Sequence, residues 1–224
     1  MIFRIKDIVA KTIYLFLGFL GISLGVVLGV KSNLGLAPWD VFHQGLAIVF
    51  NSNIGIMSMY VGIAVIFVAA AIKVYPGIGA VLNTVVIAIM IDMIMPYAPD
   101  AIALWDALIM NIVGVVLLSL GTVLYLKANL GAGPRDSLLL GLMQRFNMDT
   151  KYVKPIMEGV VLLVGFLLGG TFGIGTFFCL FLMGYFMDVF FKIFKYDPIQ
   201  TKQMNFLEQW HYLKGAMKHE SSSS

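Results

Sequence analysis

Long apolar runs separated by short polar breaks extend along most of the chain. Six of these runs approach the roughly 20 residues that an α-helix needs to cross a bilayer. The predicted spans are residues 12–30, 54–72, 78–95, 107–126, 155–170 and 173–191. The pattern predicts an all-α fold, a polytopic transmembrane helical bundle.

Two shorter runs interrupt this pattern, at residues 38–50 and 134–146. Each begins with a proline and follows a glycine-bearing break, at residues 31–37 and 127–133. A helix of about 13 residues rises about 20 Å, which is short of the roughly 30 Å hydrocarbon core. We therefore interpret both runs as short or re-entrant helices with proline in the first turn. Full crossing by both would give eight spans instead of six.

One stretch of sequence occurs twice. Residues 23–46 and 119–142 are identical at 13 of 24 aligned positions, with an offset of 96 (119 minus 23). Gly77-Ile-Gly79 recurs at the same offset as Gly173-Ile-Gly175, and Asp92 recurs as Asp188. Such internal repetition indicates one structural unit used twice.

The repeat and the spans together predict five regions. They are a basic N-terminal lead (1–11), membrane repeat 1 (12–96), an inter-repeat loop (97–106), membrane repeat 2 (107–192) and a cytoplasmic tail (193–224). Each repeat then has three long spans plus one short or re-entrant helix. Since three is odd, the two repeats face opposite ways, and both termini are cytoplasmic under the positive-inside rule. In the eight-span alternative the repeats are parallel.

Composition supports a membrane location. Apolar residues make up 60% of the chain, mean hydropathy is +0.92 and charged residues reach only 12%, about half the soluble norm of roughly 25%. The net charge of +3 lies at segment ends and in the tail, which does not suggest nucleic acid as a partner. The single cysteine, Cys179, excludes an intramolecular disulfide.

Nothing in the sequence indicates an enzyme. It has no metal-ligand cluster, nucleophile motif or phosphate-binding loop, so we expect no cofactor or metal. Irregular backbone at membrane depth, by contrast, is tolerated where it is buried in protein or lines a wet cavity. Paired broken helices in inverted repeats are a recurring transporter design, with the solute at their N-termini.

The repeated motif therefore supplies candidate substrate-binding residues. They are Asn33, Pro38, Trp39, Asp40, His43, Asn129, Pro134, Arg135 and Asp136. Structural alternatives stand beside this interpretation. Asn33 and Asn129 are suited to a turn before proline, and a carboxylate in the first turn of a helix favourably meets the helix dipole. Arg135 is suited to an anionic group, to a pair with Asp40 or Asp136, or to snorkelling.

Three further carboxylates are candidate coupling residues: Asp92, Asp188 and Glu158. The first two lie near span ends, where a simple interfacial charge is the alternative. For Glu158 the alternative is a pair with Lys154. His43 is a candidate proton relay or the donor of an interhelical hydrogen bond.

The motif from Asn33 to Leu46, followed by Pro76-Gly-Ile-Gly79 and the span to Asp92, resembles the bacterial YczE/YyaS/YitT family of integral membrane proteins. The resemblance covers roughly residues 10–192. It implies a multi-pass protein of the bacterial cytoplasmic (plasma) membrane, in a largely uncharacterised family that is sometimes grouped with permeases. It supplies no substrate and no site residues.

We expect a secondary transporter or permease for a small polar or charged solute, with proton coupling through Asp40, Asp136 or Glu158 as one hypothesis. The alternative is a non-transporting accessory protein that binds a partner protein. The expected partners are the lipid bilayer and an unidentified solute, and assembly into a homo-oligomer is left open.

Overall fold

The computed structural model describes residues 2–72, 77–131, 133–148 and 150–196. Within these ranges the chain forms α-helices and one short 3₁₀ turn, η1 (Met95–Tyr97), with no strand. The helices are α1 (Ile2–Ser32), α2 (Pro38–Val49), α3 (Ile54–Ala71), α4 (Ile78–Ile94), α5 (Leu104–Ala128), α6 (Pro134–Phe146), α7 (Thr150–Leu167) and α8 (Ile174–Ile193). The predicted all-α class is confirmed. The predicted tail from residue 197 onward and Lys73 lie outside the described residues.

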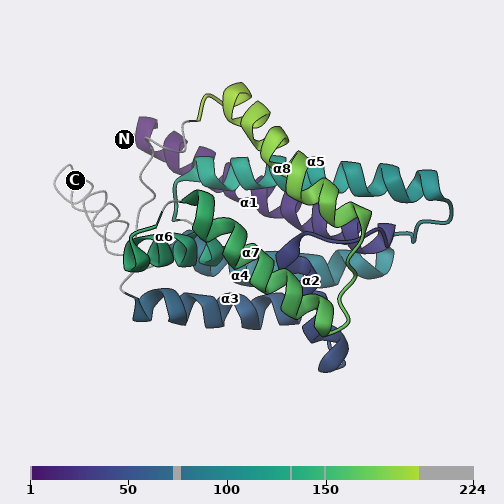
Figure 1. The fold of residues 1–224 in the computed structure, drawn as a ribbon. Helices are drawn as coiled ribbons and strands as arrows, with labels where there is room; N and C mark the ends of the chain where they lie inside the picture. The colour runs from purple at the N-terminus through teal and green to yellow at the C-terminus, as the bar shows by residue number, and fades with distance from the viewer. Residues whose placement is uncertain (1, 73–76, 132, 149, 197–224) are drawn as a thin grey trace.

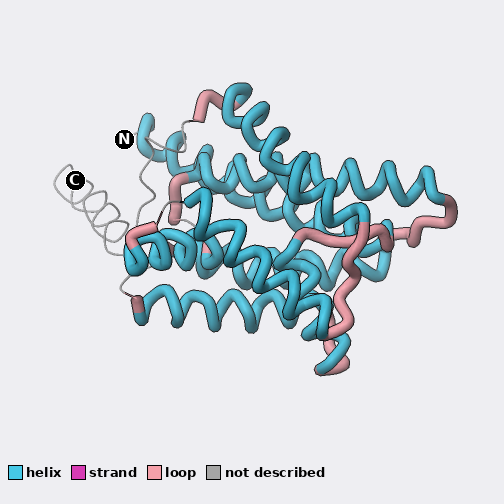
Figure 2. Tube along the Cα trace, in the orientation of Figure 1, coloured by secondary structure: helices cyan, strands magenta, loops and turns pink. Residues whose placement is uncertain are grey.

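The helices form two layers. In the first layer α1 packs along α5, with α4 beside α1 and α8 beside α5. In the second layer α3 and α7 flank the two short helices α2 and α6. As Figures 1 and 2 show, α1, α3, α4 and α5 run roughly along one direction and α7 and α8 cross them obliquely. The short helix α6 lies towards the end of the bundle that carries the N-terminus, and α2 lies towards the other end. An apolar core lies among α1, α4 and α5, around Leu15, Phe19, Ile91 and Tyr125.

The outer surface of this bundle is apolar. Large side chains such as Phe67 (71% exposed), Met93 (65%) and Phe181 (75%) face outward. Among the described residues, five helices are long and apolar enough to cross a membrane: α1, α3, α4, α5 and α8. The sixth predicted span, α7, extends over residues 150–167 instead of 155–170 and carries three charged residues in that range.

The two breaks end and restart helices as their residues predict. Asn33 follows α1 with φ 54°, and Asn129 follows α5 with φ 53°. Gly35 (φ 114°) and Gly131 (φ 105°) come two residues later, in a left-handed conformation that disfavours any residue with a Cβ. A proline then begins each short helix, where its missing N–H costs no helical hydrogen bond.

Glycines bring α1 and α5 into backbone contact. A Cβ added to Gly25 would lie 2.7 Å from the carbonyl oxygen of Gly114 and 2.8 Å from the nitrogen of Leu118. Gly18 and Gly121 meet in the same way about two turns further along both helices. Small residues at helix interfaces drive association in bilayers, because water is not there to force apolar surfaces together. The glycine spacing of α1 is therefore a packing device.

We predict that Gly25→Ala lowers stability by about 1–3 kcal/mol, because the added methyl overpacks the α1–α5 contact. Gly159→Ala is the matched control, since a Cβ at that glycine of α7 meets no atom within 4 Å. Both substitutions raise helix propensity equally. Thermal unfolding in detergent micelles measures the difference, and equal midpoints for the two variants would contradict this packing account.

Candidate functional site

Each break is hydrogen-bonded to the first turn of a helix that is distant in the sequence. The nitrogen of Gly175 donates to the carbonyl oxygen of Leu34 at 2.8 Å, and the nitrogen of Gly79 donates to that of Leu130 at 2.6 Å. The contact is close, because a Cβ on Gly35 would lie 2.6 Å from the nitrogen of Gly173. These crossed bonds satisfy backbone groups that no intrahelical partner reaches.

A buried asparagine supports the first break. The Nδ2 atom of Asn111, on α5, donates to the carbonyl oxygen of Gly35 at 3.1 Å and to Oγ of Ser32 at 3.3 Å. Its side chain is only 1% exposed. The first break is therefore hydrogen-bonded both to α5 and to the first turn of α8.

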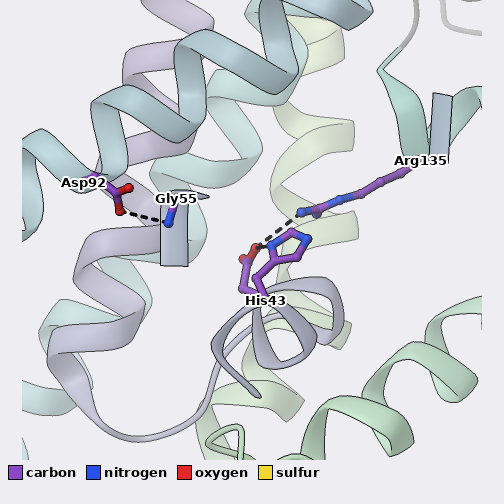
Figure 3. A network of polar contacts seen from close by, with 5 residues as sticks. His43, Gly55, Asp92 and Arg135 are labelled. Atoms are coloured by element: carbon purple, nitrogen blue, oxygen red, sulfur yellow. Dashed lines mark hydrogen bonds and ion pairs between the residues drawn. The ribbon is translucent and has the colours of Figure 1, made fainter. Parts of the chain in front are cut away.

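The first turns of α2 and α6 meet near the middle of the molecule. The Nη2 atom of Arg135 lies 3.4 Å from Oδ1 of Asp40, and the guanidinium lies 5.1 Å from the ring centre of Trp39. The Nδ1 atom of His43 lies 3.5 Å from the same carboxylate oxygen. Figure 3 shows the Arg135 side chain extending towards His43 from another part of the bundle. The Asp40 side chain is 4% exposed and that of Arg135 is 41% exposed.

A cavity of about 290 Å³ lies at this meeting point, between the two helix layers. Asp40, His43 and Arg135 line it, together with polar side chains from other helices. Those additional polar residues are Ser58, Asn83, Thr84, Thr122, Lys154 and Glu158. Two helix N-termini, each with a positive dipole end, begin at its wall. The cavity therefore offers charges of both signs and hydrogen-bonding groups in an otherwise apolar bundle.

The cavity is closed on one flank and open on the other. On the α3–α4 flank its lining is buried, as at Thr84 (6% exposed) and Ile91 (2%). On the α7–α8 flank the lining includes Leu180 (40% exposed) and Lys154 (53% exposed side chain). Nζ of Lys154 lies 3.9 Å from Oε1 of Glu158, which is the pair predicted as the structural alternative.

The predicted substrate-binding residues divide into two groups. Those that line the cavity are Pro38, Trp39, Asp40, His43, Pro134 and Arg135. Asn33 is exposed and Asn129 is half-buried at the ends of α1 and α5, where both take a left-handed conformation and do not line the cavity. Asp136 lies in the first turn of α6, and its side chain is outside the described part of the chain.

The two carboxylates predicted as a pair have different surroundings. The oxygens of Asp92 accept hydrogen bonds from the backbone nitrogens of Gly55 (2.9 Å) and Ile56 (3.1 Å), at the start of α3. Asp92 thus caps a neighbouring helix, as Figure 3 shows. Asp188 is exposed on α8. Neither residue lines the cavity.

Sequence analysis missed much of the cavity wall. Asn83, Thr84 and Thr122 lie mid-span in apolar runs, where a single polar residue gives no local signal.

Ser23 and Ser119 were visible as the first residues of the repeated stretch. Both are fully buried, and they donate to the carbonyl oxygens of Ile87 (3.4 Å) and Met183 (3.3 Å) respectively.

The fold and site define a multi-pass helical membrane protein with a cavity whose largely apolar wall carries a few charged and polar side chains. The chain belongs to a family of unknown function, DUF6198, whose model matches residues 9–192. The predicted relationship to the YczE and YyaS proteins is confirmed by the relatives described next.

Three bacterial proteins are similar to the chain. An uncharacterized protein of Haemophilus influenzae is 41% identical over 160 residues, covering 71% of this chain and 72% of the relative. The uncharacterized membrane protein YczE of Bacillus subtilis is 32% identical over 173 residues, covering 76% and 80%. The uncharacterized protein YyaS of the same organism is 26% identical over 187 residues, covering 82% and 93%. No solved structure matches the chain.

We predict that Arg135→Gln destabilises the protein by about 1–3 kcal/mol, because it removes a cation from a buried carboxylate. This is less than the roughly 3–5 kcal/mol of fully buried pairs, since the Arg135 side chain is partly exposed. Adding Asp40→Asn should restore part of the loss. Chemical unfolding of the two single variants and the double variant gives the coupling energy.

The control for this cycle is Lys31→Gln. It breaks the 2.9 Å pair with Asp100, whose side chain is 80% exposed, so we expect a change within about 0.5 kcal/mol. Strictly additive effects of the Asp40 and Arg135 substitutions would show that the two side chains do not stabilise each other.

Proposed function

We propose that the protein is a secondary transporter, or permease, for a small polar or charged solute that binds in the cavity between α2 and α6. The observation that carries the proposal is the Asp40–Arg135 pair at the facing N-termini of two short helices, on the wall of a 290 Å³ cavity. In one recurring transporter design, half-helices begin at a central site, where their free N–H groups and positive dipole ends bind a solute.

The proposal includes two inverted structural repeats around the cavity. Residues that line it occur as pairs 96 apart (134 minus 38): Pro38 with Pro134, Trp39 with Arg135, His43 with Leu139, Ser58 with Lys154, Gly62 with Glu158, and Thr84 with Leu180. The crossed bonds have the same relation, since Gly79 and Gly175 differ by 96, as do Leu34 and Leu130. In this proposal a pseudo-two-fold axis relates the two repeats and passes through the cavity, so that each repeat supplies equivalent positions to its wall.

We also propose that the protein lies in the plasma membrane with its N- and C-termini on the cytoplasmic side. Nζ of Lys127 lies 3.0 Å from the carbonyl oxygen of Phe194 and 4.9 Å from the ring centre of Tyr14, so the ends of α5 and α8 adjoin the start of α1. Lys11 and Lys192 lie near this end as well, whereas Lys31 lies at the opposite end of α1. The positive-inside rule favours a cytoplasmic location for the more basic end.

The size of the cavity limits the solute. A volume of about 290 Å³ is at the lower limit of the roughly 300–1,000 Å³ of ligand pockets. Asp40 and Arg135 carry opposite charges, and Lys154 and Glu158 repeat that combination towards the open flank. A small solute with charged or hydrogen-bonding groups matches this wall better than an extended apolar one.

We predict that a cysteine in the cavity reacts with a charged, membrane-impermeant thiosulfonate from both faces of the membrane. The variant is Thr122→Cys in a Cys179→Ala background, tested in right-side-out and inside-out vesicles. A transporter opens its site to each side in turn, so labelling should occur in both preparations. Proton coupling predicts that the labelling rate changes when a pH gradient is applied.

The control is Ile89→Cys, which is 52% exposed on α4 and does not line the cavity. Its thiol should face lipid and resist the charged reagent. Labelling of Thr122→Cys from one face only, or from neither, would contradict transport. In that case a static membrane protein that binds a partner would be the better account.

A further inference from the structure

The α3–α4 flank of the cavity is tightly closed. A Cβ on Gly62 would lie 3.3 Å from Cβ of Thr84, and a Cβ on Gly55 would lie 2.6 Å from the carboxylate carbon of Asp92. The carboxylate of Asp92 then caps the start of α3 through Gly55 and Ile56. Two glycines on one face of α3, about two turns apart, and one capping carboxylate thus join α3 to α4.

The α7–α8 flank has the equivalent positions but not the equivalent contacts. In the described part of the chain α8 packs on α5 and makes no contact with α7 comparable to that between α3 and α4. Leu180 is 40% exposed, whereas Thr84, its partner in the offset of 96, is 6% exposed. A Cβ on Gly184 of α8 would meet no atom within 4 Å, whereas the equivalent Ala88 is 3% exposed.

The sequence explains why this flank is the weaker one. Glu158 stands where α3 has Gly62, and Lys151 stands where it has Gly55. The Glu158 side chain does not allow the backbone-to-side-chain approach that Gly62 permits. Asp188, the equivalent of Asp92, is exposed. A contact that lacks both glycines is weaker, so its open and closed packings differ by less free energy than those of α3 and α4.

We propose that α7 and α8 form a gate that closes over the cavity in a second conformation. In the closed state Leu180 lies beside Glu158, at the position where Thr84 packs on Gly62 in the other repeat but with the wider helix spacing that Glu158 requires, and Asp188 lies beside the start of α7. The solute enters and leaves between these two helices, past Glu158 and Lys154. This inference rests on the proposed function, because the closed geometry is taken from the other repeat.

The test is a pair of engineered disulfides in the Cys179→Ala background. Gly62→Cys with Thr84→Cys is the reference, because its Cβ separation is close to the roughly 3.5–4.5 Å of a disulfide. Glu158→Cys with Leu180→Cys is the gate pair. With copper-phenanthroline as oxidant, we expect the gate pair to cross-link fully but roughly 10- to 1,000-fold more slowly than the reference, as for a state populated at about 0.1–10%.

The matched control is Gly159→Cys with Phe181→Cys, one position further along each helix. This rotates both thiols by about 100° around their helices, to positions that do not line the cavity. We expect this pair to stay reduced. Each variant is first checked for a single elution peak and an unchanged unfolding midpoint.

A second readout uses Thr122→Cys added to the gate pair. Oxidation of the pair should abolish labelling of Thr122→Cys from the face of the membrane to which the gap between α7 and α8 opens. Reduction of the disulfide should restore this labelling. A gate pair that stays reduced while the reference pair oxidises completely would overturn the gate. If Thr122→Cys still labels from both faces in that experiment, the transporter proposal survives without this gate. One-sided labelling with an efficient gate cross-link would overturn transport and leave a lid over a one-sided site.

Discussion

The backbone at residues 33–37 and 129–131 leaves the helix inside an apolar bundle, and the hydrogen bonds it then needs organise the rest of the molecule. Within a bilayer an unsatisfied backbone group costs several kcal/mol. The carbonyl oxygens of Leu34 and Leu130 accept hydrogen bonds from the first turns of α8 and α4 respectively. Because each break is bound by a turn from the other half of the chain, neither half is complete alone. The same bonds direct Pro38 and Pro134 towards each other, which creates the cavity between them.

Much of this fold could be predicted from local sequence. Apolar run length identified α1, α3, α4, α5 and α8, and the Gly-x-x-Pro breaks located the starts of α2 and α6 to the residue. The start of α7 was predicted less well. The sequence pattern places a helix start at Pro155, whereas this proline lies in the second turn of a helix that begins at Thr150. The start of α5 at Leu104 was also missed. There Asp106 accepts a hydrogen bond from the nitrogen of Ala103, a local cap that extends the helix into the predicted loop.

The candidate site was predictable only where the motif itself supplies it. Asp40 and Arg135 were visible because they follow repeated prolines, and their pairing was one of the predicted alternatives. Asp92 was visible as a repeated carboxylate, but its role was not, since Gly55 lies 37 residues away and only tertiary packing brings the start of α3 to it. Thr84 and Thr122 line the cavity because α4 and α5 face it, and no sequence period distinguishes that face from the lipid face.

The identical and the different positions of the two motif copies have different surroundings in the structure. Positions with the same residue in both copies hold the backbone: Ser23 and Ser119 bond to a neighbouring helix, Gly35 and Gly131 make the turn, and Pro38 and Pro134 start the short helices. Among the positions that differ, Trp39 and Arg135 line the cavity, as do His43 and Leu139; the repeated Pro38, Pro134 and Asp40 line it too. A perfectly two-fold cavity would place like charges opposite each other near its axis, and like charges in a low-dielectric site repel strongly. Replacing one tryptophan by arginine opposite Asp40 removes that symmetry. It gives one cavity both a cation and an anion.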